Sequence, residues 1–183
     1  MMEVKYAKRM MTEGGSEISD ILALTAKPEV ISFAGGLPAP ELFPVEDMER
    51  MANEVLEEVG RVALQYSSAQ GFPKFRQQIA DRMNDKQKTN VKADDILITS
   101  GSQQALEFSA KIFIDEGDVI LCESPTYLGA LNAFNGYGPK YIEVETDEDG
   151  MNMEALERVL QTTDRVKMIY VIPDFQNPTG RTW

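Results

Sequence analysis

Histidine is absent from all 183 residues of this sequence. Ser-His-Asp and Cys-His catalysis both require an imidazole to take up a proton, and histidine is a common ligand of protein-bound zinc. The absence therefore excludes these catalytic classes and the usual zinc sites.

Cysteine is nearly absent as well, since Cys122 is the only one. A disulfide within the chain is therefore excluded. Cys122 follows the apolar run Val119–Leu121, and no histidine exists to activate its thiol. We expect a buried structural thiol rather than a nucleophile.

Basic side chains are few: the sequence has 18 Lys and Arg residues and 30 Asp and Glu residues, which gives a net charge of −12. Nucleic acids and anionic membrane surfaces bind through basic patches, so both are poor partners. No apolar run approaches the roughly 18 residues of a membrane span, and residues 1–5 have no signal-peptide character. We expect a soluble, cytoplasmic protein.

The first half of the chain predicts an irregular segment and two helices. Residues 32–44 are rich in glycine and proline, which favours ordered but irregular backbone. A helix opened by Pro44 and closed near Gly60 follows from apolar residues at steps of three and four, namely Met48, Met51, Ala52, Val55, Leu56 and Val59. A second helix starts near Phe72–Pro73 and is expected to bury Phe75, Ile79 and Met83.

From Asp94 onwards, short apolar strands alternate with helices. We predict helices over 102–113 and 154–160, and strands over 96–99, 119–122, 141–144 and 168–172. This alternation indicates an α/β fold with a mostly parallel sheet flanked by helices on both faces. The sequence ends soon after the last predicted strand, where such a fold needs another helix, so we expect an incomplete large domain.

Three strand ends carry candidate binding residues. Gly101-Ser102-Gln103 turns from a strand into a helix, where backbone N–H groups suit a phosphate, although a plain helix cap explains Ser102 equally well. Tyr127 follows another strand and can stack on a flat ring or pack against a loop. Asn177, held before Pro178 and a Thr-Gly turn, presents a neutral donor and acceptor.

A fourth candidate, Tyr66, lies in the polar loop Gln65–Gly71 between the two predicted helices. A buried structural tyrosine is its alternative interpretation. Together, and in this order, the four motifs resemble those of fold-type I pyridoxal-phosphate enzymes of the class I/II aminotransferase group. The strings Ile31–Pro38 and Phe175–Gly180 are most similar to the aminoadipate/kynurenine aminotransferase branch.

The resemblance implies a role for each matching residue. It assigns the cofactor phosphate to Gly101, Ser102 and Gln103. The Tyr127 ring would stack on the pyridine ring of pyridoxal 5'-phosphate, and Asn177 would bond its phenolic oxygen. Tyr66 would reach the phosphate of a partner subunit across a homodimer interface. Gly35, Gly36 and Leu37 would lie beside the substrate.

The resemblance also implies a division of the chain. Residues 1–45 would contribute to a small domain and the substrate-side loop, and residues 46–183 would form part of the large cofactor-binding domain. The full-length enzyme would move an amino group from an amino acid to a 2-oxo acid. In the family, the cofactor lysine, the acid at the pyridine nitrogen and the substrate-binding arginine follow the motif that matches Asn177–Gly180. None of the ten lysines here matches that lysine, so we expect an N-terminal fragment that is inactive alone.

Three alternatives remain open from the sequence. The chain could be the sensor domain of a transcription regulator, but the short segment before Ser32 and the acidic composition argue against a DNA-binding domain. Another reaction on the same fold, such as carbon–sulfur lysis or decarboxylation, is possible because fold does not fix chemistry. A natural non-catalytic protein is the third.

Overall fold

The computed structural model describes residues 5–7, 30–31 and 36–183. These residues fall into two compact units: residues 99–183 with 5–7 form one, and residues 30–31 with 36–98 form the other. The first contains a parallel sheet, and the second is built from helices and loops.

The sheet of the first unit has three strands in the order β2-β1-β5, and both pairings are parallel. β1 (Val119–Glu123) is the central strand, with β2 (Lys140–Val144) and β5 (Val166–Tyr170) as its neighbours. All five residues of β1 are buried, as expected for a continuous apolar strand in a parallel sheet. The predicted parallel sheet is confirmed, although β5 begins and ends two residues before its predicted range.

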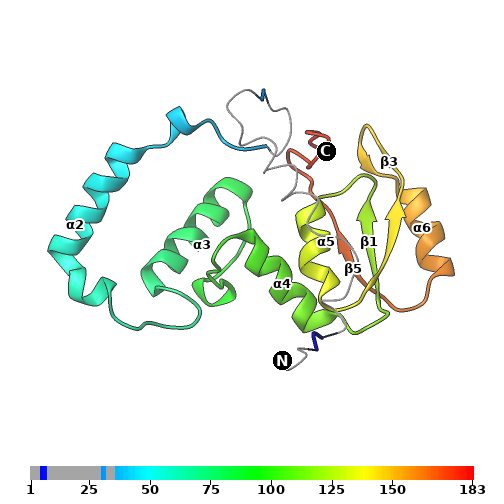
Figure 1. Cartoon of the computed structure of the whole chain (residues 1–183), viewed down its shortest axis with the longest axis horizontal. Helices are drawn as coiled ribbons and strands as arrows, with labels where there is room; N and C mark the ends of the chain where they lie inside the picture. The colour runs from blue at the N-terminus through cyan, green and yellow to red at the C-terminus, as the bar shows by residue number, and fades with distance from the viewer. Residues whose placement is uncertain (1–4, 8–29, 32–35) are drawn as a thin grey trace. The chain divides into compact units, whose positions relative to one another are not determined.

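Helices cover both faces of the sheet (Figure 1). Ile120 of β1 packs into one cluster with residues of α4 (Ser102–Phe113) and α5 (Leu128–Asn135). Its neighbours Val119 and Leu121 point the other way and pack with α6 (Met153–Thr162). This alternation follows from the two-residue period of a strand. The predicted helix over 102–113 matches α4 residue for residue.

A short antiparallel hairpin and a side-chain cap connect β2 to α6. The hairpin pairs β3 (Thr146–Asp147) with β4 (Gly150–Met151). Asn152 then caps α6, because its Oδ1 accepts the Ala155 N–H at 2.8 Å. This bond satisfies one of the N–H groups that a helix start leaves without a partner.

An ion pair joins the loops that lead into β1 and β5. Arg165 Nη2 lies 2.8 Å from Asp118 Oδ1, and its Nε donates to the same oxygen at 2.9 Å. The other Asp118 oxygen accepts the Asp115 N–H at 2.9 Å. Asp118 is buried, whereas much of the Arg165 side chain is exposed. The pair therefore ties the amino ends of two neighbouring strands together.

The second unit contains two helices and two single turns of 3₁₀ helix. They are η2 (Pro40–Leu42), α2 (Val45–Ala63), α3 (Pro73–Gln87) and η3 (Ala93–Asp95). α2 begins directly after Pro44, as predicted, but the end expected near Gly60 is a local distortion at Val59, and the helix continues to Ala63. No helix in the described ranges, α2 included, is both long enough and apolar enough to cross a membrane.

The buried face of α3 differs from the prediction. Phe75 was expected inside but is 49% exposed, whereas Arg76 and Ala80 are buried and Ile79 and Met83 are half-buried. Arg76 lies against the turn at η3, where its Nη1 donates to the Ala93 carbonyl at 2.9 Å. The most buried row of α3 is therefore that of Arg76 and Ala80, one residue after Phe75 and Ile79. A long arginine side chain can bury its aliphatic part in this way while its charged end makes a hydrogen bond.

The strand predicted over Ile96–Thr99 is wrong, because this segment is irregular in the structure. No strand in the described part of the chain pairs with it. Ile98 instead donates its N–H to the Gln70 carbonyl at 2.9 Å, and its side chain lies over Gly71. A strand needs a partner ladder, which apolar composition alone does not supply.

The Asp118–Arg165 pair predicts a pH-dependent stability. The Asp115 N–H lowers the pKa of Asp118, burial opposes this, and Arg165 lowers the pKa further. A depressed carboxyl pKa stabilises the fold above the unfolded-state value of about 3.9, and this contribution is lost as pH falls through the lower folded-state pKa. We expect Asp118→Asn to lower the thermal midpoint at pH 7, with the difference from wild type shrinking below about pH 4. Asp149→Asn, at an exposed turn, is the control; an Asp118→Asn deficit that stays constant to pH 3 would contradict the assignment.

Candidate functional site

The candidate site lies at the carboxyl ends of β1 and β5. Because these strands are parallel neighbours, the segments that follow them, Ser124–Tyr127 and Val171–Gly180, emerge at the same edge of the sheet. In open α/β sheets, ligands usually bind at this edge. Two of the segments predicted to bind a cofactor are therefore adjacent by topology.

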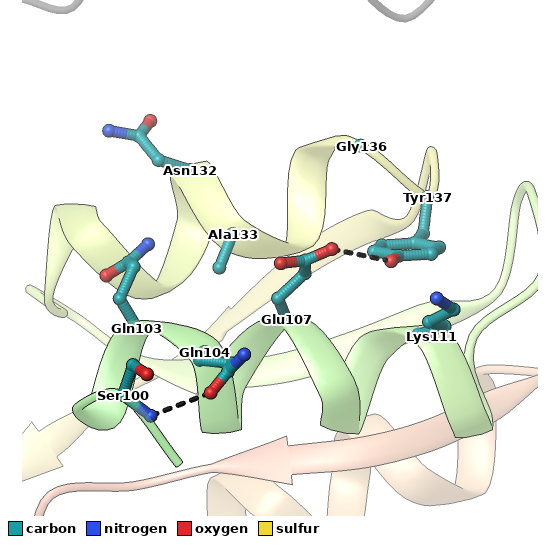
Figure 2. Close-up of a pocket in the computed structure, with 9 residues that line it drawn as sticks. All are labelled: Ser100, Gln103, Gln104, Glu107, Lys111, Asn132, Ala133, Gly136 and Tyr137. Atoms are coloured by element: carbon teal, nitrogen blue, oxygen red, sulfur yellow. Dashed lines mark hydrogen bonds between the residues drawn. The ribbon is translucent and has the colours of Figure 1, made fainter. Parts of the chain in front are cut away.

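The turn into α4 has the geometry expected of an anion-binding turn. Gly101 has a φ of +85°, a backbone conformation that side-chain-bearing residues rarely adopt. Thr99 Oγ1 donates to the Gly101 carbonyl at 3.0 Å, and the Ser100 N–H donates to Gln104 Oε1 at 2.7 Å, as Figure 2 shows for the latter. No N-cap side chain bonds the first N–H groups of α4, so the alternative in which Ser102 acts as a plain cap is not observed. These amides suit an anion.

Gln103 connects this turn to the Tyr127 segment. Its Nε2 donates to the Gly129 carbonyl at 2.8 Å, in the first turn of α5. Tyr127 is the residue before α5, and the hydroxyl end of its ring lies so close to Gly129 that a Cβ on Gly129 would clash with it. Tyr127 is half-buried and packs against the core cluster that contains Phe134. The side chain of Gln103 therefore bonds to protein, and the predicted phosphate contact of this residue rests on its backbone N–H.

Gln176 connects the Asn177 segment to the Tyr127 segment. Gln176 is 4% exposed, and its Nε2 donates to the Pro125 carbonyl at 2.8 Å. Its Oε1 accepts both the N–H and the hydroxyl of Thr179, at 2.9 and 2.8 Å. Asn177, the next residue, is exposed. The turn is thus anchored from beneath while the Asn177 side chain is presented to solvent.

Glu123, the last residue of β1, is a residue that the sequence interpretation missed. It is 1% exposed, and its Oε2 accepts the Ile172 N–H at 3.0 Å and the Gln176 Nε2 at 3.4 Å. The one signal available in the sequence was an acidic residue closing the apolar strand Val-Ile-Leu-Cys-Glu. Acidic residues are seldom fully buried without partners, so this position is informative.

The predicted site residues thus divide between the two units. Gly101 to Gln103, Tyr127 and Asn177 belong to the first unit and are linked by the Gln103 and Gln176 bonds. Gly36, Leu37 and Tyr66 belong to the second unit, where Leu37 is exposed and Tyr66 is 100% exposed, so Tyr66 is not buried within this chain. Gly35 lies outside the described residues.

An open groove of about 870 Å³ runs beside the start of α4 (Figure 2). It lies between α4 and α5, and Gln103 and Glu107 project from α4 along it. Most of its lining side chains are polar. The lining residues are Ser100, Gln103, Gln104, Glu107, Lys111, Asn132, Ala133, Gly136 and Tyr137.

Cys122 takes no part in this edge chemistry. It is buried in β1, and burial, together with Glu143 and Glu123, raises the pKa of its thiol to about 11. A thiol with such a pKa is almost entirely protonated at neutral pH and is a poor nucleophile. The interpretation of Cys122 as a buried structural thiol is confirmed.

A helix start, an aromatic ring and an amide at the carboxyl edge of a parallel sheet are typical of α/β proteins that bind a phosphate-bearing ligand. The sequence comparisons identify the family within this class. Residues 30–183 match the aminotransferase class I and II family, and the chain belongs to it.

Curated and solved relatives agree with this assignment. Aromatic-amino-acid aminotransferase 1 of Thermococcus litoralis is 43% identical over 98% of this chain and 44% of its own length. The kynurenine aminotransferase of Pyrococcus horikoshii has a TM-score of 0.88 and 39% identity, over 97% of this chain and 45% of that one. The alpha-aminoadipate aminotransferase of Thermus thermophilus has a TM-score of 0.83 and 42% identity, over 97% and 42%. The chain therefore spans less than half the length of these relatives.

These matches confirm the predicted fold and the resemblance to the aminoadipate/kynurenine branch. They also support pyridoxal phosphate as the family's cofactor: the P. horikoshii enzyme was solved with PMP and the T. thermophilus enzyme with N-(5'-phosphopyridoxyl)-L-leucine. Matches of another kind include the uncharacterized HTH-type transcriptional regulator YdcR of Escherichia coli, 32% identical over 90% of this chain and 35% of its own length.

The contact between Tyr127 and Gly129 predicts a steric effect of one methyl group. We expect Gly129→Ala to displace the Tyr127 ring and to cost about 1–3 kcal/mol in unfolding free energy, measured by urea denaturation. Gly136→Ala, at the C-cap of the same helix, is the matched control because a Cβ there meets no atom within 4 Å. Equal stability of the two variants would show that the Tyr127 ring does not occupy this position.

Proposed function

We propose that this chain is the cofactor-holding part of a pyridoxal-phosphate-dependent aminotransferase, which moves an amino group from an amino acid to a 2-oxo acid. The observation that carries the proposal is the pair of hydrogen bonds joining three motif segments at one sheet edge: Gln103 to Gly129 and Gln176 to Pro125. The relatives' names, which specify aromatic amino acids, kynurenine and aminoadipate, support the reaction class without choosing a substrate.

The residues present fit this cofactor. The uncapped start of α4 after Gly101 offers backbone N–H groups to a phosphate, helped by the helix dipole. Tyr127 is connected to this turn through Gln103 and Gly129, which supports a role for its ring in stacking on a ring attached to that phosphate. Asn177 would donate its side-chain amide to the phenolic oxygen. Pyridoxal phosphate itself supplies the electron sink that makes loss of the substrate α-proton feasible.

The remaining predicted roles are part of the same proposal. Residues 46–183 would form part of the large domain, and residues 1–45 would contribute to the small domain, with Gly35, Gly36 and Leu37 beside the substrate. The full exposure of Tyr66 is compatible with a contact to a partner subunit in a homodimer. A cytoplasmic location accords with small soluble substrates.

We further propose that these 183 residues do not catalyse transamination alone. Covalent catalysis on this cofactor requires a lysine amine, and none of the ten lysines matches the family's position. Lys111, which lines the groove beside α4, is near the C-terminal end of that helix rather than at the sheet edge. What this chain provides is binding and orientation.

A regulator's sensor domain is the second candidate, because YdcR matches most of the chain. Its identity of 32% is lower than the 43% of the T. litoralis aminotransferase, which favours the enzyme. A lyase or decarboxylase on the same fold would use the same residues to hold the cofactor. Assays of the full-length protein for amino-group transfer, with 2-oxoglutarate as acceptor, separate these functions.

Borohydride trapping tests the absence of the catalytic lysine. We expect the chain mixed with pyridoxal phosphate and then reduced to carry no stoichiometric adduct on one lysine, only scattered labelling of exposed amines, as read by visible absorption and peptide mass mapping. A single stoichiometric adduct on one lysine within residues 1–183 would show that the chain holds the cofactor covalently in its own right.

Equilibrium dialysis against pyridoxal phosphate tests the binding residues. We expect Tyr127→Leu to weaken binding about tenfold, or ~1.4 kcal/mol, because the ring contact is lost while the backbone N–H groups of α4 are retained. Tyr6→Leu, at an exposed position near the N-terminus, is the control and should bind like wild type. Unchanged affinity in Tyr127→Leu would remove Tyr127 from the site.

A further inference from the structure

We propose that Glu123 and Gln176 are positioning residues that hold the Tyr127 and Asn177 segments in fixed register with each other. The inference rests on the proposed function for its ligand, but the positioning itself is a property of the protein. Neither residue is among those to which the resemblance assigns a cofactor contact, although Gln176 lies inside the matching string Phe175–Gly180. Both side chains are buried.

The Gln176 amide has its full orientation determined by its partners. Its nitrogen faces Glu123 Oε2 at 3.4 Å and the Pro125 carbonyl at 2.8 Å, so both donors are used. Its oxygen faces Thr179 and accepts two bonds. If the amide were rotated by 180°, its oxygen would face two acceptors, Glu123 Oε2 and the Pro125 carbonyl, and its nitrogen would face the Thr179 N–H, which is a donor. One side chain therefore spans the two segments and also closes its own turn around Asn177.

Glu123 supplies the acceptor that orients this amide. A single carboxylate oxygen, Oε2, accepts from Gln176 and from the Ile172 N–H at the start of the segment after β5. No Lys or Arg in the described part of the chain forms an ion pair with Glu123. Burying a carboxylate without a cation costs free energy that an apolar residue at the end of β1 would not cost. A requirement for local geometry accounts for a glutamate in this strand.

The bonded residues are close in sequence to Tyr127 and Asn177, so the positions of these two side chains are coupled. Tyr127 is two residues from Pro125, whose carbonyl Gln176 bonds, and Asn177 is the residue next to Gln176. A shift of Gln176 therefore moves Asn177 relative to Tyr127 by a similar amount. Displacements of about 1 Å are enough to impair site geometry strongly. Holding two ligand-facing side chains from neighbouring strands in register is thus a functional requirement and not only a packing one.

The sequence provides a reporter beside this cluster. A small cavity of about 10 Å³ is bordered by Glu123, Gln176 and Trp183, the only tryptophan of the chain. The backbone N–H of Trp183 also donates to the Pro173 carbonyl at 3.0 Å, at the opposite end of the turn. Its fluorescence emission should therefore respond to movement of residues 173–183.

The first experiment measures positioning without any ligand. The full chain is compared with Glu123→Leu, Glu123→Gln and the control Glu143→Leu, whose carboxylate on β2 bonds Ser124 and not Gln176. We expect Glu123→Leu to accelerate amide hydrogen exchange at Ile172 and Thr179 and to shift Trp183 emission. Glu123→Gln should retain wild-type values, because its carbonyl oxygen can accept both bonds now made by Oε2. Glu143→Leu should also match wild type at these amides.

The second experiment uses two probes, pyridoxal phosphate and inorganic phosphate. We expect Glu123→Leu to raise the dissociation constant for pyridoxal phosphate about tenfold and to leave that for inorganic phosphate unchanged, since the α4 amides are untouched. Glu123→Gln should restore pyridoxal phosphate affinity. A merely structural role would weaken both probes together and would not be restored by glutamine.

Each outcome is decisive. Unaltered exchange at Ile172 and Thr179 in Glu123→Leu overturns the positioning role, as does a Glu123→Gln variant that behaves like leucine. A wild-type chain that fails to bind pyridoxal phosphate overturns the proposed function, and the exchange and emission data then decide the positioning role independently. Unfolding of Glu123→Leu is detected by loss of the far-ultraviolet circular dichroism signal; in that case Gln176→Met, which keeps the length of the side chain, gives the same comparison.

Discussion

The structure of the sheet unit depends on the double pairing of β1. Its backbone groups are bonded to β2 on one side and β5 on the other, and its two faces are closed by Ile120 against α4 and α5 and by Leu121 against α6. A strand held on four sides has little freedom, so its last residue is a fixed point in the unit. The candidate binding segment with Tyr127 begins directly after that residue.

At the carboxyl edge, hydrogen bonds between segments hold the polar groups that follow the rigid strands. Loops are normally more mobile than the strands they follow. Here the segments after β1 and β5 are bonded to each other through Gln176, and the Tyr127 segment is bonded to α4 through Gln103. Tyr127 and Asn177 thus each lie within two residues of a hydrogen bond to a neighbouring segment. The site combines loop side chains with a precision closer to that of the sheet.

Local patterns predicted much of the sheet unit correctly, and the failures, which lie in residues 36–99, share one cause. α4 follows from its apolar spacing after Gly101, and β1 from a continuous apolar run, because those signals are contained within the element. Ile96–Thr99 has the same apolar character but forms no strand, since pairing is set by a neighbour and not by composition. Phe75 is exposed for a related reason: Arg76 has a partner at Ala93, 17 residues away.

In the candidate site as well, contacts between residues far apart in sequence could not be predicted from local patterns. Tyr127 and Asn177 were identifiable from motifs at strand ends, whereas Glu123 and Gln176 act through a contact 53 residues apart in sequence. A glutamate at the end of an apolar strand and a glutamine before Asn-Pro have many local explanations. Only the fold shows that one bonds the other, and that this bond lies beneath both candidate ligand-facing residues.

The chain has no histidine, and the side-chain donors that join the segments at this edge are amides. The donors that join its segments are the side-chain amides of Gln103 and Gln176 and backbone N–H groups such as that of Ile172. Amides do not titrate in the physiological range, so these donors keep their protons as pH changes. A scaffold of this kind suits a family in which the bound cofactor supplies the reactive chemistry and the protein supplies orientation.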